Sequence, residues 1–388
     1  MNISVSLTDK NLFYMISFDN TMVDFKKRIE KIWAKVVEKN NIERLIVTGA
    51  SNIYYLSGTD AASAAILSEN GLLLISPRLE YLRAIEETHI GKVVAFVKGD
   101  VEVSEYEEIR RGELLDVIKD ALAGLEPDRI GLVATSKDFK QKVEEKLGAQ
   151  VKDATKDFTL VRRQKEDIEI KMMIMASRIA EQALRRAVDM LEPGITEAEV
   201  ASEIIKFFVR RGHTFSFYPI VAFGEHSAHP HAKPSLKKLR EGEFVKIDIG
   251  AKYNGYCSDI TRTFVFGRAS SRQKRLFNAV LRAQRESMNE IKSNIDAVKP
   301  YQTAYKILKE EGLAKYFNHG LGHGVGIDIH ENPYLTYESK ERLLTGDVVT
   351  VEPGVYLAGY GGIRIEDMVV VEENGYRLIT LFDKEFEI

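Results

Sequence analysis

Residues 244–264 carry a strong β-hairpin signal, because an Asn-Gly pair separates two runs of β-type residues. Asn-Gly is the preferred sequence of a two-residue type I′ turn, whose twist matches that of the strands it joins. Such a turn pairs Tyr253 with Tyr256 and, further along the strands, Asp248 with Thr261. The hairpin therefore predicts an antiparallel sheet with a defined register in this part of the chain.

In this register Asp248 and Asp259 lie on one face as diagonal neighbours, roughly 7–8 Å apart at the backbone. Two carboxylates placed this close repel each other, and a bound cation would relieve the repulsion. The alternative is a solvated polar face whose acids pair with Lys246 or Arg262. Only Lys246 shares the face of the acids, so the pattern favours a cation site.

Two further acids occur in apolar β-type runs near the C-terminus. Glu352 ends the run 347–352, and Glu366 lies on one face with Arg364 in a strand expected over 362–371. Apolar runs of this kind indicate buried strands, where an unpaired carboxylate is costly. A bound metal would offset this cost for all four acids.

Segment 319–331 places His319, His323 and His330 among four glycines. Imidazole binds metals and transfers protons near neutral pH, and glycine lets the backbone approach a ligand closely. The alternative is a glycine-rich turn with surface histidines. Of the 8 histidines, three more lie in a second cluster: His226, His229 and His231.

Four carboxylates with one imidazole form a hard, oxygen-rich ligand set. Such a set suits Mn²⁺, Co²⁺ or Fe²⁺ better than a thiolate-rich zinc site. It also exceeds the three protein ligands of a catalytic zinc. The set therefore predicts two metals joined by bridging carboxylates.

The order of these residues resembles the pita-bread metallopeptidases, which include methionine aminopeptidases, aminopeptidase P and prolidase. Four segments resemble the proline-specific branch: 227–231, 258–263, 319–331 and 362–367. The resemblance is strong over residues 160–388. Over residues 22–155 it rests on Asn52-Ile-Tyr-Tyr-Leu-Ser-Gly58 and on an α/β pattern.

The resemblance implies an α/β, creatinase-like N-terminal domain followed by an α+β pita-bread catalytic domain. We expect an N-terminal extension of unclear status over 1–21, the creatinase-like domain over 22–155 and the catalytic domain over 156–388. Met22 is an alternative start. The charged stretch 162–167 is expected to form the junction and to begin a helix that reaches Met190.

Local patterns predict the secondary structure of both domains. A helix is expected over 24–39, and the capping box that begins at Thr196 predicts another. Further helices are expected over 112–124, 137–147 and 271–312. The β-type runs are 44–48, 64–67, 72–75, 92–97 and 130–134.

The resemblance also implies a role for each site residue. The metal ligands would be Asp248, Asp259, His323, Glu352 and Glu366, with Asp259 and Glu366 bridging both metals. The catalytic residues would be His231 and His330, which contact the substrate carbonyl and the tetrahedral intermediate, and Glu352, which accepts a proton. His319 would line the proline side of the pocket. Arg364 and Thr261 would hold an aspartate ligand in place, while His226 and His229 are interpreted as loop histidines.

Composition excludes several classes of protein and site. The net charge of −3 argues against a dedicated nucleic-acid binder. No apolar run approaches the ~20 residues that span a bilayer, and no secretory signal is visible at the N-terminus. The single cysteine, Cys257, excludes an intrachain disulfide and a CxxC zinc site. We expect a cytoplasmic protein.

These features together predict a dinuclear-metal peptidase that hydrolyses Xaa-Pro dipeptides by metal-activated water. Manganese or cobalt is favoured, with iron or zinc as alternatives. One alternative function is that of aminopeptidase P, which acts on longer peptides, and another is a non-catalytic peptide-binding scaffold. The resemblance also suggests a homodimer. The N-terminal domain carries no ligand motif, so we expect it to select substrate length rather than to take part in the metal chemistry.

Overall fold

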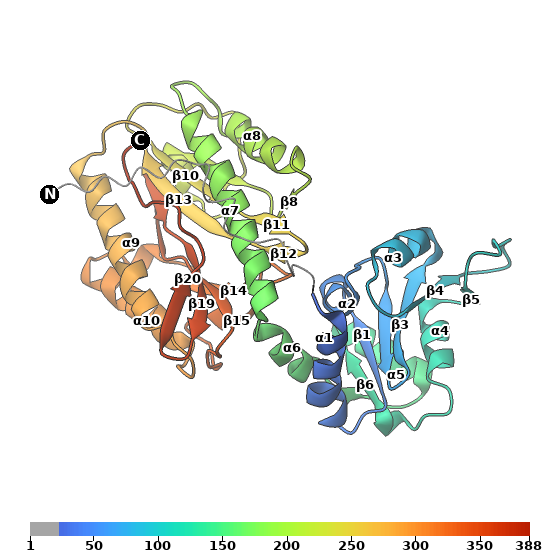
Figure 1. Ribbon diagram of the computed structural model, residues 1–388. Helices are drawn as coiled ribbons and strands as arrows, with labels where there is room; N and C mark the ends of the chain where they lie inside the picture. The colour runs from blue at the N-terminus through green and yellow to red at the C-terminus, as the bar shows by residue number, and fades with distance from the viewer. Residues whose placement is uncertain (1–22) are drawn as a thin grey trace.

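The structure, a computed structural model, describes residues 23–388. The expected extension over 1–21 and the alternative start at Met22 lie outside these residues. Figure 1 shows two domains joined through α6 (Thr155–Arg163) and α7 (Asp167–Asp189). Within residues 23–388, no helix combines the length and the apolar character that a membrane span requires.

The N-terminal domain is built on a seven-stranded mixed sheet in the order β5-β4-β3-β2-β1-β6-β7. Its strands are β1 (Arg44–Thr48), β2 (Ala64–Ser68), β3 (Gly71–Pro77), β4 (Lys92–Val97), β5 (Ile109–Arg111), β6 (Ile130–Val133) and β7 (Lys152–Asp153). Its helices are α1 (Phe25–Ile32), which continues as a π-helix over Trp33–Glu38, α2 (Ala50–Ser57), α3 (Tyr81–Glu87), α4 (Leu114–Ala121) and α5 (Lys137–Leu147). The expected strands over 44–48 and 92–97 coincide with β1 and β4, and the helix over 137–147 with α5.

Successive residues of β1 point into different hydrophobic clusters, because side chains along a strand alternate between the two faces of the sheet. Leu45 and Val47 pack in one hydrophobic cluster with residues of α1, α2 and α3. Ile46 packs in another cluster with residues of α4 and α5. The sheet is therefore covered by helices on both faces.

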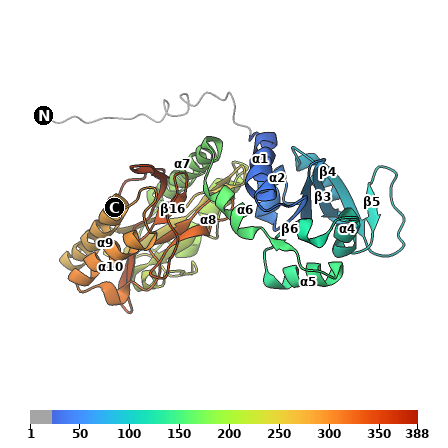
Figure 2. The ribbon, with the colours of Figure 1, turned by 90° about the horizontal axis from the view of Figure 1, so that it is seen from below.

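The helix expected to begin in the charged stretch and reach Met190 is α7, which begins at Asp167 and has Met190 as its C-cap, whereas the shorter helix α6 before it was not expected. The chain forms α6, breaks after Arg163 and begins again as α7. A capping box causes the restart, because the Glu166 side chain accepts from the backbone of Glu169 and the Glu169 side chain accepts from that of Glu166. The backbone N–H of Lys165, within the break, donates to the carbonyl of Gly346 at 3.0 Å. Figure 2 shows α6 between the two domains.

The catalytic domain packs short antiparallel sheets between two pairs of helices. One pair is α7 with α8 (Glu197–Val209), and the other is α9 (Ser271–Asn289) with α10 (Val298–Glu310). The strands are β8 (Thr214–Phe215), β9 (Ile220–Phe223), β10 (Phe244–Ile249), β11 (Ala251–Tyr253), β12 (Tyr256–Cys257), β13 (Ile260–Val265), β14 (Gly322–Gly324), β15 (Glu331–Leu335), β16 (Val348–Val351), β17 (Gly354–Leu357), β18 (Gly361–Arg364), β19 (Asp367–Glu372) and β20 (Gly375–Leu378). The largest of these sheets has the order β15-β14-β16-β19-β20.

The central hairpin has the predicted register. Tyr253 pairs with Tyr256, and Asp248 pairs with Thr261. The hairpin is nevertheless divided at Gly250 into β10–β13 and β11–β12. The carbonyl oxygen of Ser258 comes so close there that a Cβ on residue 250 would lie 1.9 Å from it.

The single strand expected over 362–371 is two strands, β18 and β19, which belong to different sheets. Glu366 lies in the break between them. Its backbone N–H donates to the carbonyl of Thr261 at 3.1 Å. This contact places Glu366 beside the central hairpin, on which Asp248 and Asp259 lie.

Candidate metal centre

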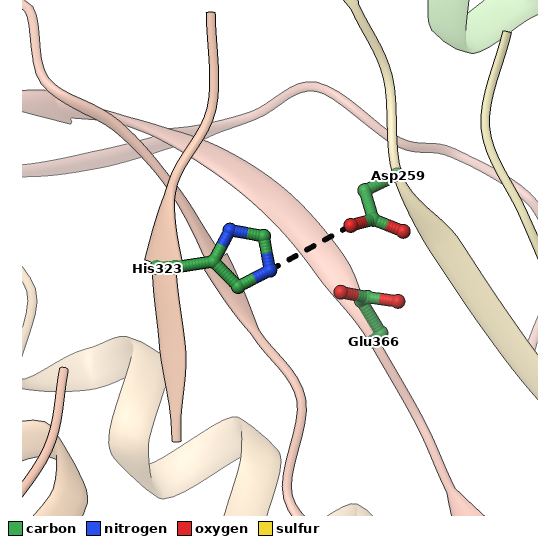
Figure 3. A group of neighbouring side chains, drawn as sticks. All are labelled: Asp259, His323 and Glu366. Carbon is green, nitrogen blue, oxygen red and sulfur yellow. Dashed lines mark ion pairs between the residues drawn. The ribbon is translucent and has the colours of Figure 1, made fainter. Parts of the chain in front are cut away.

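Three side chains from separate elements meet beside the central hairpin. Asp259 precedes β13, His323 lies on β14 and Glu366 precedes β19. One ligand atom of each lies within 4.8 Å of the others, and all three side chains are buried. Figure 3 shows them pointing toward one another, with His323 Nε2 3.7 Å from Asp259 Oδ2.

The other two expected ligands lie at the same place. The Oε1 atom of Glu352, directly after β16, is 3.4 Å from His323 Nε2. Asp248, on β10, contacts the guanidinium of Arg364 through Oδ2. Its other oxygen, Oδ1, is buried and has no hydrogen-bond partner within residues 23–388. A buried acceptor of this kind is costly unless a ligand engages it.

The carboxylates strongly disfavour one another's charged forms. Burial, followed by the charges of neighbouring acids, raises the pKa of Asp259 and of Glu366 well above their ordinary values. Burial raises the pKa of Glu352 to about 7, against the opposing charge of Arg364 and with a smaller contribution from the charge of Asp248. A divalent cation would compensate this crowding. The oxygen-rich donor set and the orphaned oxygen of Asp248 therefore fit a metal site.

Arg364 is the cationic neighbour of the acids. The hairpin pattern had instead indicated Lys246 for this position. Lys246 Nζ turns away to donate to the carbonyl oxygens of Ser227 at 3.0 Å and His229 at 2.6 Å. Arg262 pairs instead with Asp367, with its NH2 2.7 Å from Oδ1. The hairpin register could not reveal Arg364, because this residue arrives from a separate sheet.

Thr261 orients Glu366. The resemblance had instead implied that Thr261 would hold an aspartate ligand in place. Its Oγ1 donates to Glu366 Oε2 at 2.8 Å, and Arg364 Nε donates to Thr261 Oγ1 at 3.1 Å. One arginine thereby contacts Asp248 directly and reaches Glu366 through a hydroxyl. This chain of contacts fixes two carboxylates of the centre relative to each other.

His323, which is buried, and His319, which is half-buried, are both neutral near pH 7. Burial lowers the pKa of His323 to about 4 and that of His319 to about 3. His323 Nδ1 lies 3.1 Å from the Gly324 carbonyl, which leaves Nε2 facing the acids. His319 Nε2 lies 3.0 Å from the hydroxyl of Tyr356. A neutral imidazole is the form that binds a metal.

The exposed histidines His330 and His231 lie beside this buried group. The ring of His330 is 4.3 Å from that of His323, centroid to centroid. His231 is exposed, and a charge on its ring would contribute to lowering the pKa of both His319 and His330.

Two functional contacts were missed from the sequence. Tyr356, on β17, accepts a hydrogen bond from Arg364 NH1 at 2.8 Å as well as contacting His319. His226 Nδ1 lies 2.8 Å from Oε1 of the fully buried Glu197. A tyrosine in an apolar strand gives no signal of such a contact. The carboxylate at the start of α8 and the scarcity of histidine could have suggested the pairing of Glu197 with His226.

Comparison with known proteins matches both halves of the chain. The profile of metallopeptidase family M24 matches residues 171–373, and that of the creatinase/prolidase N-terminal domain matches residues 28–164. The Xaa-Pro dipeptidase of Pyrococcus furiosus is 36% identical over 365 residues, which is 93% of this chain and 99% of that protein.

Solved structures give the same result. A Xaa-Pro dipeptidase from Bacillus anthracis superposes with a TM-score of 0.82 at 30% identity, covering 94% of this chain and 100% of that one. An X-Pro aminopeptidase from Thermotoga maritima superposes with a TM-score of 0.78 at 29% identity, covering 93% of this chain and 100% of that one. The similarity thus extends over both domains.

Proposed function

This chain belongs to metallopeptidase family M24, with a creatinase-like N-terminal domain and a pita-bread catalytic domain, and we propose that it hydrolyses Xaa-Pro dipeptides. The observation that carries the proposal is the convergence of Asp259, His323 and Glu366 in a chain 36% identical to a Xaa-Pro dipeptidase over 93% of its length. Divalent metals are the cofactors of this family, and the donors described above suit them.

We propose five metal ligands: Asp248, Asp259, His323, Glu352 and Glu366. Two cations fit this number of donors, with Asp259 and Glu366 shared between them. The predominance of carboxylates favours manganese or cobalt over zinc. When bound, such cations supply a water nucleophile at neutral pH and polarise the substrate carbonyl.

Side chains of this protein then carry out the proton transfers and stabilise the developing charge. Glu352 accepts the proton of the attacking water and delivers it to the leaving nitrogen. His231 and His330 donate hydrogen bonds to the oxygen on which negative charge develops. Arg364 keeps Asp248 in place throughout.

The proline side of the substrate meets His319 in this proposal. His319 is half-buried, neutral and packed edge-on against Phe317 at 5.2 Å between ring centroids. The Xaa-Pro amide nitrogen carries no hydrogen, and its ring fixes φ, so general peptidases hold it poorly. An apolar, uncharged wall suits the pyrrolidine ring.

Release of the N-terminal residue from longer Xaa-Pro peptides is the second candidate, favoured by the superposition on the Thermotoga maritima aminopeptidase. Hydrolysis of Met-Pro, compared with a Met-Pro-Xaa tripeptide in Mn²⁺ or Co²⁺, separates the two. We expect faster hydrolysis of the dipeptide. A preference for the tripeptide would establish the aminopeptidase, and a protein that holds no metal and cleaves neither peptide would be a scaffold.

We further propose that the protein is a homodimer in which the N-terminal domain helps to close the cleft. Leu79, in the 3-10 turn before α3, and Leu82, in the first turn of α3, are 91% and 74% exposed, which is unusual for apolar side chains. Sedimentation equilibrium of the wild-type protein and of Leu82→Glu tests this assembly. A wild-type protein that sediments as a monomer would contradict it.

A further inference from the structure

Three sequence features that the proposed reaction does not use converge between the domains. They are the Asn52–Gly58 motif, the charged stretch 162–167 and the acids of segment 319–331. The residues that meet there form an interdomain clamp, a name used below for Ser51, Asn52, Arg162, Lys165, Asp328 and Glu331. Ser51 directly precedes the Asn52–Gly58 motif, and the other residues of the clamp belong to the three features.

Arg162 is the centre of the clamp. Its NH2 group lies 3.0 Å from Asp328 Oδ2 and 3.0 Å from Glu331 Oε2. Its NH1 group donates to Asn52 Oδ1 at 2.6 Å. The guanidinium therefore binds α2 of the N-terminal domain and two acids of the catalytic domain simultaneously.

Two further contacts tie the same acids. The hydroxyl of Ser51, on α2, donates to Asp328, and the ammonium of Lys165 pairs with Glu331. The Arg162 and Lys165 side chains are only 12% and 2% exposed. The Glu331 side chain is 13% exposed and that of Asp328 44%, so the contacts of Glu331 are shielded from water on both sides and are stronger than surface pairs.

The two tethered acids, Asp328 and Glu331, flank His330 in the sequence. The backbone that precedes them, at Gly326, is closely packed. A Cβ on Gly326 would come within 2.5 Å of Glu331 Oε1, so the carboxylate folds over a glycine that leaves room for it. The carbonyl of Gly326 accepts from the backbone N–H of Cys257 at 2.8 Å. The backbone on both sides of His330 is thus held, and the His330 ring lies 4.3 Å from that of His323, centroid to centroid.

We propose that Arg162 is a positioning residue, which holds the His330 loop in its working geometry by bridging α2 to Asp328 and Glu331. Arg162 does not touch the substrate in this proposal; it acts through His330. The inference rests on the proposed function in one respect, namely that His330 acts on the substrate. It assigns the N-terminal domain a part in the reaction through Ser51 and Asn52.

Kinetics of Arg162→Gln and His330→Ala, alone and combined, test the inference. We expect Arg162→Gln to lower kcat on the order of tenfold or more, because a misplacement of about 1 Å can cost up to 10²-fold. Metal stoichiometry should be unchanged. In the His330→Ala background the same change should cost almost nothing further, because its effect passes through that imidazole. Additive losses in the double variant would overturn the proposal.

Arg163→Lys is the matched control, because Arg163 is the next residue of α6 and also reaches into the catalytic domain. It binds Asp347 at 3.1 and 2.7 Å and Glu341 at 2.9 Å, and among residues 23–388 its hydrogen bonds include neither Asp328 nor Glu331. Its loss of rate, if any, should add to that of His330→Ala. Arg162→Lys should recover part of the rate, since it restores the charge without the planar fork. If Arg162→Gln does not fold, Ser51→Ala removes one tether of Asp328 with far less risk to folding and carries the same test.

A second measurement does not depend on activity. Hydrogen exchange of a peptide spanning residues 324–331, followed by mass spectrometry on the metal-free protein, should accelerate in Arg162→Gln and not in Arg163→Lys. Unchanged exchange in Arg162→Gln would overturn the proposal. If the wild-type protein cleaves no Xaa-Pro peptide, the proposed function fails, while the exchange result still decides whether the clamp holds this loop.

Discussion

Asp259 and Glu366 share the most crowded charge environment of the centre, and each is proposed to bridge two cations. We predict that Asp259→Asn or Glu366→Gln abolishes hydrolysis while the protein stays folded. An amide has neither the charge nor the bridging mode of a carboxylate. The measurement is turnover in a metal-replete assay, with circular dichroism as the control for folding. Turnover near that of the wild type in either variant would contradict the assignment.

His231 and His330 are exposed beside the centre rather than buried within it. We predict that His231→Ala or His330→Ala lowers kcat on the order of 10²–10³-fold, the cost of losing one donor to a developing oxyanion. Neither variant should lose a metal equivalent. Metal analysis alongside kinetics distinguishes a histidine that stabilises the oxyanion from one that binds a metal. A variant with reduced metal stoichiometry would show that the replaced histidine is a metal ligand.

Removal of the metals should make the stability of this protein fall as pH rises. Burial raises the pKa of Glu352 from 4.5 to about 7, and the pKa values of Asp259 and Glu366 rise as well. These carboxyls make the folded chain bind more protons than the unfolded chain, whereas the lowered pKa values of His319 and His323 have the opposite effect below about pH 6.5. The free energy of unfolding therefore declines with pH above about pH 6.5, where these histidines are neutral in both states.

Thermal unfolding of the chelator-treated protein from about pH 6.5 to about pH 8 measures this effect. Tm should fall across the range, and Glu352→Gln should flatten part of the slope. Saturating Mn²⁺ should reverse the trend, because metal binding requires deprotonated ligands. A Tm that rises with pH in the metal-free wild-type protein would refute the prediction.

The start of α8 is fixed to the His231 loop by one buried carboxylate. Glu197 accepts from the backbone N–H groups of Phe223 and Ser235 and from the Ser235 hydroxyl, at 2.8, 2.9 and 2.6 Å, and it also pairs with His226. We predict that Glu197→Ala lowers the free energy of unfolding by about 2–5 kcal/mol, since each orphaned donor costs about 1–3 kcal/mol.

Glu203→Ala is the control on the same helix. Glu203 pairs only with Arg186 and Lys206, which are at least half exposed, and such pairs contribute about 0–1 kcal/mol. Urea unfolding of both variants, with the m value monitored, gives the comparison. Equal losses in the two variants would show that the buried network does not carry this stability.

The sequence predicted those elements whose signals are local. The Asn254-Gly255 turn has φ values of 45° and 80°, as a type I′ turn requires, and it set the pairing of Asp248 with Thr261. The capping box at Thr196 likewise marked the start of α8. Both signals depend on residues within a few positions of each other, which is the range that sequence patterns describe.

Short or interrupted elements were missed for identifiable reasons. Helices α2 and α3 have only 8 and 7 residues, too few for a helical period to stand out. The break at Glu366 depends on how separate sheets pack. The contact of Arg364 with Asp248 depends on the same packing, so the resemblance implied it while the local pattern did not. Lys246 was placed on the correct face, but the loop carbonyls that bind its ammonium come from a distant segment.

The two domains share one hydrophobic core. A single cluster contains Ile32 and Phe158 from the N-terminal side together with Met173, Val325 and Met368 from the catalytic domain. The ion pairs of the interdomain clamp lie beside it. The N-terminal domain was expected to contribute only substrate selection, yet this packing indicates that neither domain can unfold without exposing apolar surface of the other.

We therefore predict that the protein unfolds in one cooperative transition, although chains with two domains often unfold in steps. The single tryptophan, Trp33, packs against the shared core from the N-terminal domain, so its fluorescence reports that domain alone. Far-UV circular dichroism reports the whole chain. In metal-free protein the two urea transitions should coincide, and calorimetry should give equal calorimetric and van't Hoff enthalpies. A fluorescence transition at lower urea than the dichroism transition would show that the N-terminal domain unfolds independently, because the shared core would then not couple the two domains.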